Sequence, residues 1–390
     1  MITETRRGLT ALAALTLFIV LTGELFPNVL GVPGAIVLWA VTTGLAAVAI
    51  TKLGGWAKLR PSLLPKSLAL FLLLAVLSIA WASNRGPAAF SVGAMLALFI
   101  GGIFLATTFS WPALVALLGR STRLVVGLSL TFELSTAIFV RQGIRPVAGL
   151  SAGSEISLSN LFSGGPILGI AGSADALGAV AALALVILWL QWASGTISRR
   201  RMLGWGIVIA GVLLLSGSWA AAASLGVTGV ALGLILLARR RAEGQRGSVA
   251  IVAGVLALAG ATALLTVTGL WPMLPSGLAA MSPAGLVLLL AIIVSAAYRS
   301  WWLAADRQRD AAGDPLSFEA ATLLPLLLVV FATCQVMAGT SFETGAGLSL
   351  SWLLLVLVTV KSKQDAHSVA LPLAAVSGRY RDRPLPGRQR

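Results

Sequence analysis

Long apolar runs separated by short basic clusters constrain this chain more than any other feature. A helix needs about 20 apolar residues to cross the hydrocarbon core of a bilayer. Only 11% of the residues are charged and 58% are hydrophobic, whereas a soluble domain carries about a quarter charged residues. The sequence therefore predicts an all-α, polytopic integral membrane protein with about 12 transmembrane helices. The predicted spans lie near residues 8–26, 31–51, 66–82, 87–108, 123–140, 176–194, 203–219, 221–238, 248–270, 284–303, 317–338 and 346–360.

The basic residues are distributed unevenly between the two sides of these predicted spans. Of the 28 Lys and Arg residues, 25 fall on one side, and only Arg85, Arg141 and Arg145 fall on the other. The positive-inside rule assigns the basic side to the cytoplasm, so an even number of spans places both termini there. The net charge of +15 then reflects attraction to anionic headgroups. We expect membrane lipids as partners, and no nucleic acid.

The predicted domain organisation is simple. Residues 1–361 form a single transmembrane domain, and residues 362–390 form a basic cytoplasmic tail whose composition predicts disorder. The longest loop on the outer side, residues 141–175, is too short to fold alone, and its segment 161–172 is expected to be partly re-entrant and packed over the bundle. The amphipathic segment 111–119 is predicted to lie along the inner interface.

Glu133 lies inside the predicted span 123–140. A carboxyl group is costly there unless it is protonated, paired or hydrated, and such residues often mark function. Two interpretations stay open. Glu133 is either a functional intramembrane acid or a structural hydrogen-bonding group that joins neighbouring helices.

Four further candidates lie in or beside the outer loop. Arg141 and Arg145 can bind a diphosphate through bidentate hydrogen bonds, and the alternative is that they anchor the chain to lipid headgroups. Asp175 and Glu155 can act as a general base for a sugar hydroxyl. The simpler interpretation of Asp175 is an N-cap on a helix that begins at residue 176.

The sequence offers little for metal or redox chemistry. It contains one cysteine, Cys334, and one histidine, His367, which lies in the predicted tail. The outer glycines do not have the spacing of a phosphate-binding loop. We therefore expect neither a metal nor a cofactor.

Four segments together resemble the O-antigen ligase and O-antigen polymerase-like superfamily in its actinobacterial form. The first, at 161–190, is LFSGGPILGIAGSADALGAVAALALVILWL, and the second, at 211–237, contains a Ser-x-Ser turn: GVLLLSGSWAAAASLGVTGVALGLILL. The third, at 282–307, ends in a basic, Trp-rich edge: SPAGLVLLLAIIVSAAYRSWWLAADR. The fourth, at 323–363, is LLPLLLVVFATCQVMAGTSFETGAGLSLSWLLLVLVTVKSK, which is similar to the family's closing pair of helices.

The resemblance implies a protein of the bacterial cytoplasmic (inner) membrane that takes part in cell-surface polysaccharide assembly. Members transfer a glycan from an undecaprenyl diphosphate carrier on the outer face, without metal or nucleotide. By this resemblance Arg141 and Arg145 would bind the diphosphate, and Asp175 or Glu155 would act as base. Other proteins of envelope-glycan assembly are the expected partners.

The chain departs from the family pattern at several positions. Pro166 and Trp219 stand where members carry Arg, Ser173 and Asp175 stand where they carry Asn, and the loop 271–283 has no His, Arg or acidic residue. These departures leave open whether the chain is a transferase or a non-catalytic homologue that acts as partner or scaffold. A small-solute or lipid transporter is a third hypothesis, disfavoured because the two halves show no internal repeat.

Overall fold

The computed structural model describes residues 2–23, 25–54, 65–82, 84–140, 143–144, 157, 161–162, 164–240, 283–305, 319–337 and 350–365. Within these ranges the chain is helical, and its one β-type pairing is an isolated bridge between Ile144 and Ser157. The long helices are α1 (Ile2–Leu21), α2 (Leu25–Lys52), α4 (Lys66–Ser78), α5 (Arg85–Thr108), α6 (Trp111–Ser135), α7 (Ala174–Ala193), α8 (Arg199–Ser216), α9 (Trp219–Arg240), α12 (Pro283–Ala305) and α13 (Leu324–Met337). Residues 350–365 form a further helix.

The helices follow the predicted spans closely. Each predicted span except 248–270, which lies outside the described residues, coincides with a helix. Seven described helices are long and apolar enough to cross a membrane. The chain is thus a multi-pass helical membrane protein, while the count of twelve spans and the cytoplasmic placement of both termini stay predictions.

Glycine and proline set the start of the regular helix in the second span. α2 is interrupted at Gly31, whose φ of 74° and ψ of 166° are not helical, and Pro33 follows two residues later. Proline favours the first turn of a helix, where its missing N–H is not needed. The regular part of α2 therefore begins just after residue 31, which is the predicted start of the span.

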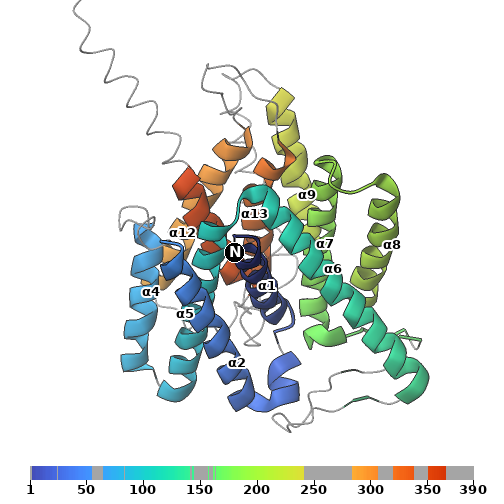
Figure 1. Cartoon of the computed structure of the whole chain (residues 1–390), viewed down its shortest axis with the longest axis horizontal. Helices are drawn as coiled ribbons and strands as arrows, with labels where there is room; N and C mark the ends of the chain where they lie inside the picture. The colour runs from blue at the N-terminus through green and yellow to red at the C-terminus, as the bar shows by residue number, and fades with distance from the viewer. Residues whose placement is uncertain are drawn as a thin grey trace, which may run out of the picture.

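α7 is one of the two most buried spanning helices described. Its apolar residues surround the helix axis on all faces, and a helix of this kind is stable only when it is surrounded by other protein. It packs against α6, α8 and α9, and 72% of its spanning window is buried. Figure 1 shows α7, α8 and α9 together on one side of the bundle and α2, α4 and α5 on the other, with α6 running from the middle of the bundle across α7.

The prediction that residues 111–119 lie along the interface is wrong. These residues form the first turns of α6, which continues without a break to Ser135. Leu114 and Leu118 are fully buried in the core, and the indole N–H of Trp111 donates to Asp365 Oδ2 at 2.7 Å. The apolar face that suggests an interfacial helix is covered by protein instead of by lipid.

The boundary predicted at residue 361 also shifts. The last helix continues through Asp365, and residues 366–390, the rest of the predicted tail, lie outside the described residues. Lys361 is bound to the bundle, since its Nζ donates to Ala106 O at 3.3 Å and lies 5.4 Å from the Trp111 ring centroid.

Candidate functional site

The outer segment, which we define as residues 164–173, packs into the bundle beside α6, α7 and α8. Ile167 and Ala171 are buried, and residues Gly169–Ala171 form a 3₁₀ turn. Backbone without regular helical hydrogen bonds is tolerated at membrane depth only where protein satisfies its polar groups. This agrees with the expected packing of 161–172 over the bundle.

Four consecutive backbone N–H groups of the outer segment find acceptors on α6 and α8. The Ile167 N–H donates to Leu215 O at 3.1 Å, and the Ile170 N–H donates to Ser129 Oγ at 3.2 Å. Between them, the N–H groups of Leu168 and Gly169 both donate to Glu133 Oε1, at 3.1 and 2.8 Å. Side chains of α6 thus replace the helical carbonyl partners that this segment lacks.

Glu133 is fully buried and joins α6 to the outer segment and to Ser157. Its Oε1 accepts the two N–H groups of the outer segment, and its Oε2 accepts the Ser157 hydroxyl at 2.9 Å. Ser157 is buried as well, and its backbone oxygen accepts from the Ile144 N–H at 2.9 Å. The Glu133 carboxyl group therefore binds the backbone of the outer segment and the hydroxyl of Ser157. The hypothesis that Glu133 is a structural group joining neighbouring helices predicts a different partner, on an adjacent helix.

Gly169 permits this close approach. Its φ is +58°, a conformation that favours glycine. A Cβ atom at this position would lie 2.6 Å from Ser129 Cβ and 2.7 Å from Ser129 Oγ. No other residue can occupy this position without moving the outer segment away from α6.

Asp175 lies in the first turn of α7 but does not cap it. The predicted capping role belongs to Ser173, whose Oγ accepts the Ala176 N–H at 3.2 Å, because the helix begins at Ala174 and not at residue 176. Asp175 Oδ1 instead accepts the Ser218 hydroxyl at 2.5 Å. A carboxylate in a first turn is also favoured by the helix dipole.

The Ser-x-Ser turn joins α8 to α9 directly against α7. Ser218 Oγ accepts the Ala221 N–H at 3.3 Å and so caps α9, while Gly217 adopts a positive φ of 64°. A Cβ on Gly178 would lie 2.6 Å from Ser218 Cβ and 2.9 Å from Ser216 Oγ. The N-terminal ends of α7 and α9 are therefore joined by the Asp175–Ser218 hydrogen bond and by a contact that only glycine permits.

Three predicted site residues, Arg141, Arg145 and Glu155, lie outside the described residues. Glu133 binds the middle of the outer segment, at Leu168 and Gly169, and Asp175 lies in the first turn of α7, which directly follows that segment. Ile144, which precedes Arg145, is joined to Glu133 through Ser157.

Sequence reasoning missed the hydroxyl groups of this site. Ser129 lies four residues before Glu133, so both side chains project from one face of α6, and both bind consecutive N–H groups of the outer segment. That spacing is visible in the sequence. Ser157 and Ser218 carry no comparable signal, because their partners lie far along the chain.

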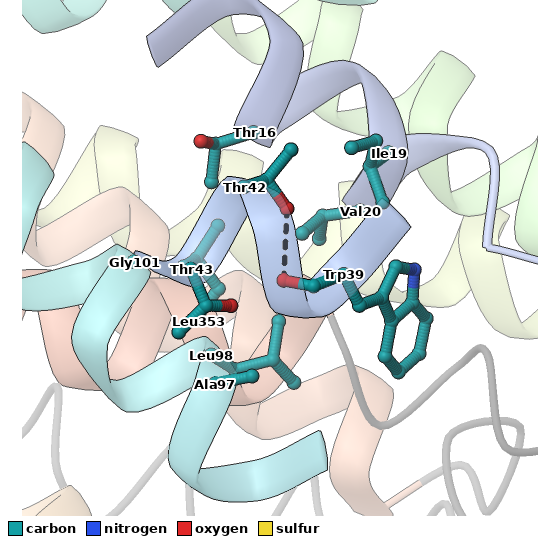
Figure 2. A pocket seen from close by; sticks show the side chains of 10 residues that line it. All are labelled: Thr16, Ile19, Val20, Trp39, Thr42, Thr43, Ala97, Leu98, Gly101 and Leu353. Atoms are coloured by element: carbon teal, nitrogen blue, oxygen red, sulfur yellow. Dashed lines mark hydrogen bonds between the residues drawn. The ribbon is translucent and has the colours of Figure 1, made fainter. Parts of the chain in front are cut away.

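No group of three or more His, Cys, Asp or Glu side chains that suits a metal ion occurs in the described ranges. A separate cavity of about 40 Å³ lies among α1, α2, α5 and the 350–365 helix, and no ionisable side chain lines it. Figure 2 shows it lined by aliphatic and threonine side chains and by Trp39, with Thr42 Oγ1 donating to Trp39 O at 3.0 Å.

Comparison with protein-family models, curated proteins and solved structures gave no match. The fold and the site therefore define a class only: a multi-pass helical membrane protein whose buried polar groups gather at the predicted outer ends of α6, α7, α8 and α9.

Proposed function

We propose that this protein acts in cell-surface polysaccharide assembly in the bacterial cytoplasmic membrane, as a metal-independent transferase for a glycan carried by undecaprenyl diphosphate. The observation that carries the proposal is the outer segment, which Glu133 holds in the bundle beside Asp175. A rigid polar site at this membrane face is what transfer from a lipid carrier requires, because the carrier diphosphate lies at the interface.

In this proposal Arg141 and Arg145 bind the diphosphate, since guanidinium groups keep their charge and form bidentate hydrogen bonds with phosphate oxygens. Asp175 or Glu155 accepts the proton of the attacking sugar hydroxyl. Glu133 acts as a positioning residue, because its carboxyl oxygens are occupied by the outer segment and Ser157.

A second candidate is a non-catalytic homologue that acts as partner or scaffold in a glycan-assembly complex. The engagement of Asp175 by Ser218 at 2.5 Å favours it, because a base must give up that hydrogen bond before it can accept a proton. The missing arginines at Pro166 and Trp219 favour it too.

Binding and turnover separate the two candidates. Purified protein in lipid nanodiscs is titrated with undecaprenyl diphosphate, and undecaprenyl monophosphate serves as the control ligand. The transferase predicts that Arg141→Ala/Arg145→Ala weakens diphosphate binding by about tenfold or more, since each lost charged hydrogen bond costs about 1.5–3 kcal/mol.

The transferase further predicts release of undecaprenyl diphosphate when a carrier-linked glycan and an acceptor are supplied. Binding without release supports the partner hypothesis. Equal binding of both ligands by the wild type and the double variant contradicts a role of these arginines in diphosphate recognition.

A further inference from the structure

Two arginines lie one turn apart in the middle of α6. Arg120 is exposed and Arg123 is partly buried. Residues three apart on a helix are neighbours on its surface, so both side chains project from one face of α6. Neither guanidinium group forms an ion pair with a carboxyl group in the part of the chain that the structure describes. We name these two residues the arginine pair.

Gln191 fixes Arg123 at the level where α7 ends. Arg123 Nη1 donates to Gln191 Oε1, and Gln191 Nε2 donates in turn to Val115 O at 3.1 Å. Gln191 lies in the last turn of α7, and its backbone oxygen accepts the Thr196 N–H at 2.9 Å in the turn that leads to α8. Figure 1 shows that turn at the top of the bundle. Since the 20 residues of α7 match the thickness of the hydrocarbon core, Arg123 lies at the depth where phospholipid headgroups begin.

The Arg123 guanidinium keeps free donors in this position. Its Nε and Nη2 groups make no hydrogen bond with the described residues. A guanidinium that is held by one nitrogen can direct its other N–H groups at a phosphate. Gln191 is a neutral partner, so it orients the charge without neutralising it. Two adjacent positive charges repel each other, and a bound anion offsets that repulsion.

An open apolar surface begins next to the arginine pair and favours a lipid over a free anion. Gly127 lies four residues after Arg123 and seven after Arg120, so it is on the same face of α6. A Cβ atom added to Gly127 would have one neighbouring atom within 4 Å, Trp205 Cη2 of α8 at 3.8 Å. Leu124 and Trp205, on the two sides of this glycine, are 53% and 37% exposed. The surface between them has room for an acyl chain.

We infer that Arg120 and Arg123 bind the phosphate of an anionic phospholipid, one of whose acyl chains lies over Gly127 between Leu124 and Trp205. Glu133 lies ten residues further along α6, which is about 15 Å at the rise of a helix. The lipid site is therefore separate from the outer segment and does not rest on the proposed function.

The test is native mass spectrometry of the full chain in detergent micelles titrated with phosphatidylglycerol, with phosphatidylcholine as the comparison lipid of zero net charge. Each arginine near a headgroup favours an anionic lipid by about fivefold. We expect Arg120→Gln/Arg123→Gln to weaken binding of the first phosphatidylglycerol by about tenfold or more. Binding of phosphatidylcholine should change by less than about twofold.

The matched control is Arg199→Gln/Arg200→Gln, which removes the same charge from exposed positions in the first turn of α8. These residues lie six and five positions before Trp205, so they point to other faces of α8. The control should change phosphatidylglycerol binding by less than about twofold. Equal weakening in both double variants would show general attraction to a basic surface and would overturn the specific site.

Two single variants keep the proposal testable if the loss of the Arg123–Gln191 bond disturbs the fold. Arg120→Gln changes one exposed side chain and should weaken phosphatidylglycerol binding by about fivefold. Gly127→Leu fills the surface beside Trp205 and should weaken it by about threefold or more, whereas Gly127→Ala adds only an ordinary contact. Unchanged affinity in Arg120→Gln would contradict the phosphate site, and unchanged affinity in Gly127→Leu would contradict the position of the acyl chain. Displacement of the lipid by glycerol 3-phosphate at similar concentrations would overturn the lipid assignment.

Discussion

At the scale of single residues, the outer site depends on two carboxyl groups that are candidates for function and that also form structural hydrogen bonds. Glu133 and Asp175 are predictable from chemistry alone, as an acid inside a span and an acid beside a loop. Both carboxyl groups accept hydrogen bonds that hold the backbone together. The sequence identifies such acids because they are rare in apolar helices, but it cannot identify their partners, which lie 24 to 43 residues away.

Substitution of Glu133 tests its role as an anchor. Glu133→Ala leaves the Leu168 and Gly169 N–H groups buried without an acceptor, at a cost of about 1–3 kcal/mol for each group. We expect a clear loss of thermal stability, measured through tryptophan fluorescence in detergent. Glu133→Gln keeps an acceptor oxygen and should retain most of the stability. An alanine variant as stable as the glutamine variant would contradict the anchor.

Asp175 and Ser218 should be energetically coupled. Hydrogen bonds to charged groups contribute about 1.5–3 kcal/mol, so a double-mutant cycle of Asp175→Ala and Ser218→Ala should show a coupling of about 1–2 kcal/mol. Unfolding in graded denaturant measures the four variants. Additive losses would mean that the two residues act independently. Asp175→Asn keeps an acceptor and serves as the mild control.

At the scale of helices, glycine decides how closely the elements approach. Gly178 on α7 faces the Ser-x-Ser turn, whereas a Cβ atom added to Gly204 on α8 would have no neighbouring atom within 4 Å. Small residues at helix contacts allow close backbone approach in membranes. The sequence shows both glycines but cannot tell which one faces a neighbour.

Alanine substitutions separate these two glycines. Gly178→Ala places a methyl group 2.6 Å from Ser218 Cβ and should destabilise the protein by about 1–3 kcal/mol. Gly204→Ala adds a methyl group in open space and should stabilise α8 by up to about 1 kcal/mol. Thermal unfolding of both variants measures the difference. Similar effects from the two substitutions would contradict the packing at Gly178.

Element positions can be predicted from sequence much better than element contacts. Apolar length locates a spanning helix because the bilayer imposes it, so each described long helix coincides with a predicted span. The exception is the start of α6, where an amphipathic pattern suggests lipid and the structure shows protein. The predicted cap of α7 lies two residues too late because Ser173 and Asp175 are both good capping residues.

At the scale of the whole molecule, hydrogen bonds join helix ends that spans of alternating direction would place on the same side of the membrane. Glu133, Ser157 and Gly169 meet at one end. At the other, Arg239 Nε donates to Ala304 O and Arg239 Nη2 donates to Thr322 Oγ1, both at 2.8 Å. Each set joins residues that the predicted spans place together on one side, and which side faces the cytoplasm stays a prediction.

Single-cysteine labelling tests this sidedness in a variant that lacks Cys334. Phe162, which is 73% exposed, lies on the predicted outer side, and exposed Ser194 lies in the loop between α7 and α8. Phe162→Cys should react with a membrane-impermeant maleimide in intact cells, and Ser194→Cys only after permeabilisation. The opposite pattern would invert the topology and move the outer segment to the cytoplasm.

The most direct test of the proposed function measures carrier-linked glycan in cells. Three strains are compared: a gene deletion, the deletion with the wild-type gene, and the deletion with Arg141→Ala/Arg145→Ala at matched protein level. We predict that the deletion accumulates carrier-linked glycan, that the wild-type gene restores normal levels, and that the double variant does not. Full rescue by the double variant would contradict the arginine mechanism and favour the partner role, and unchanged glycans in the deletion would contradict the proposed function itself.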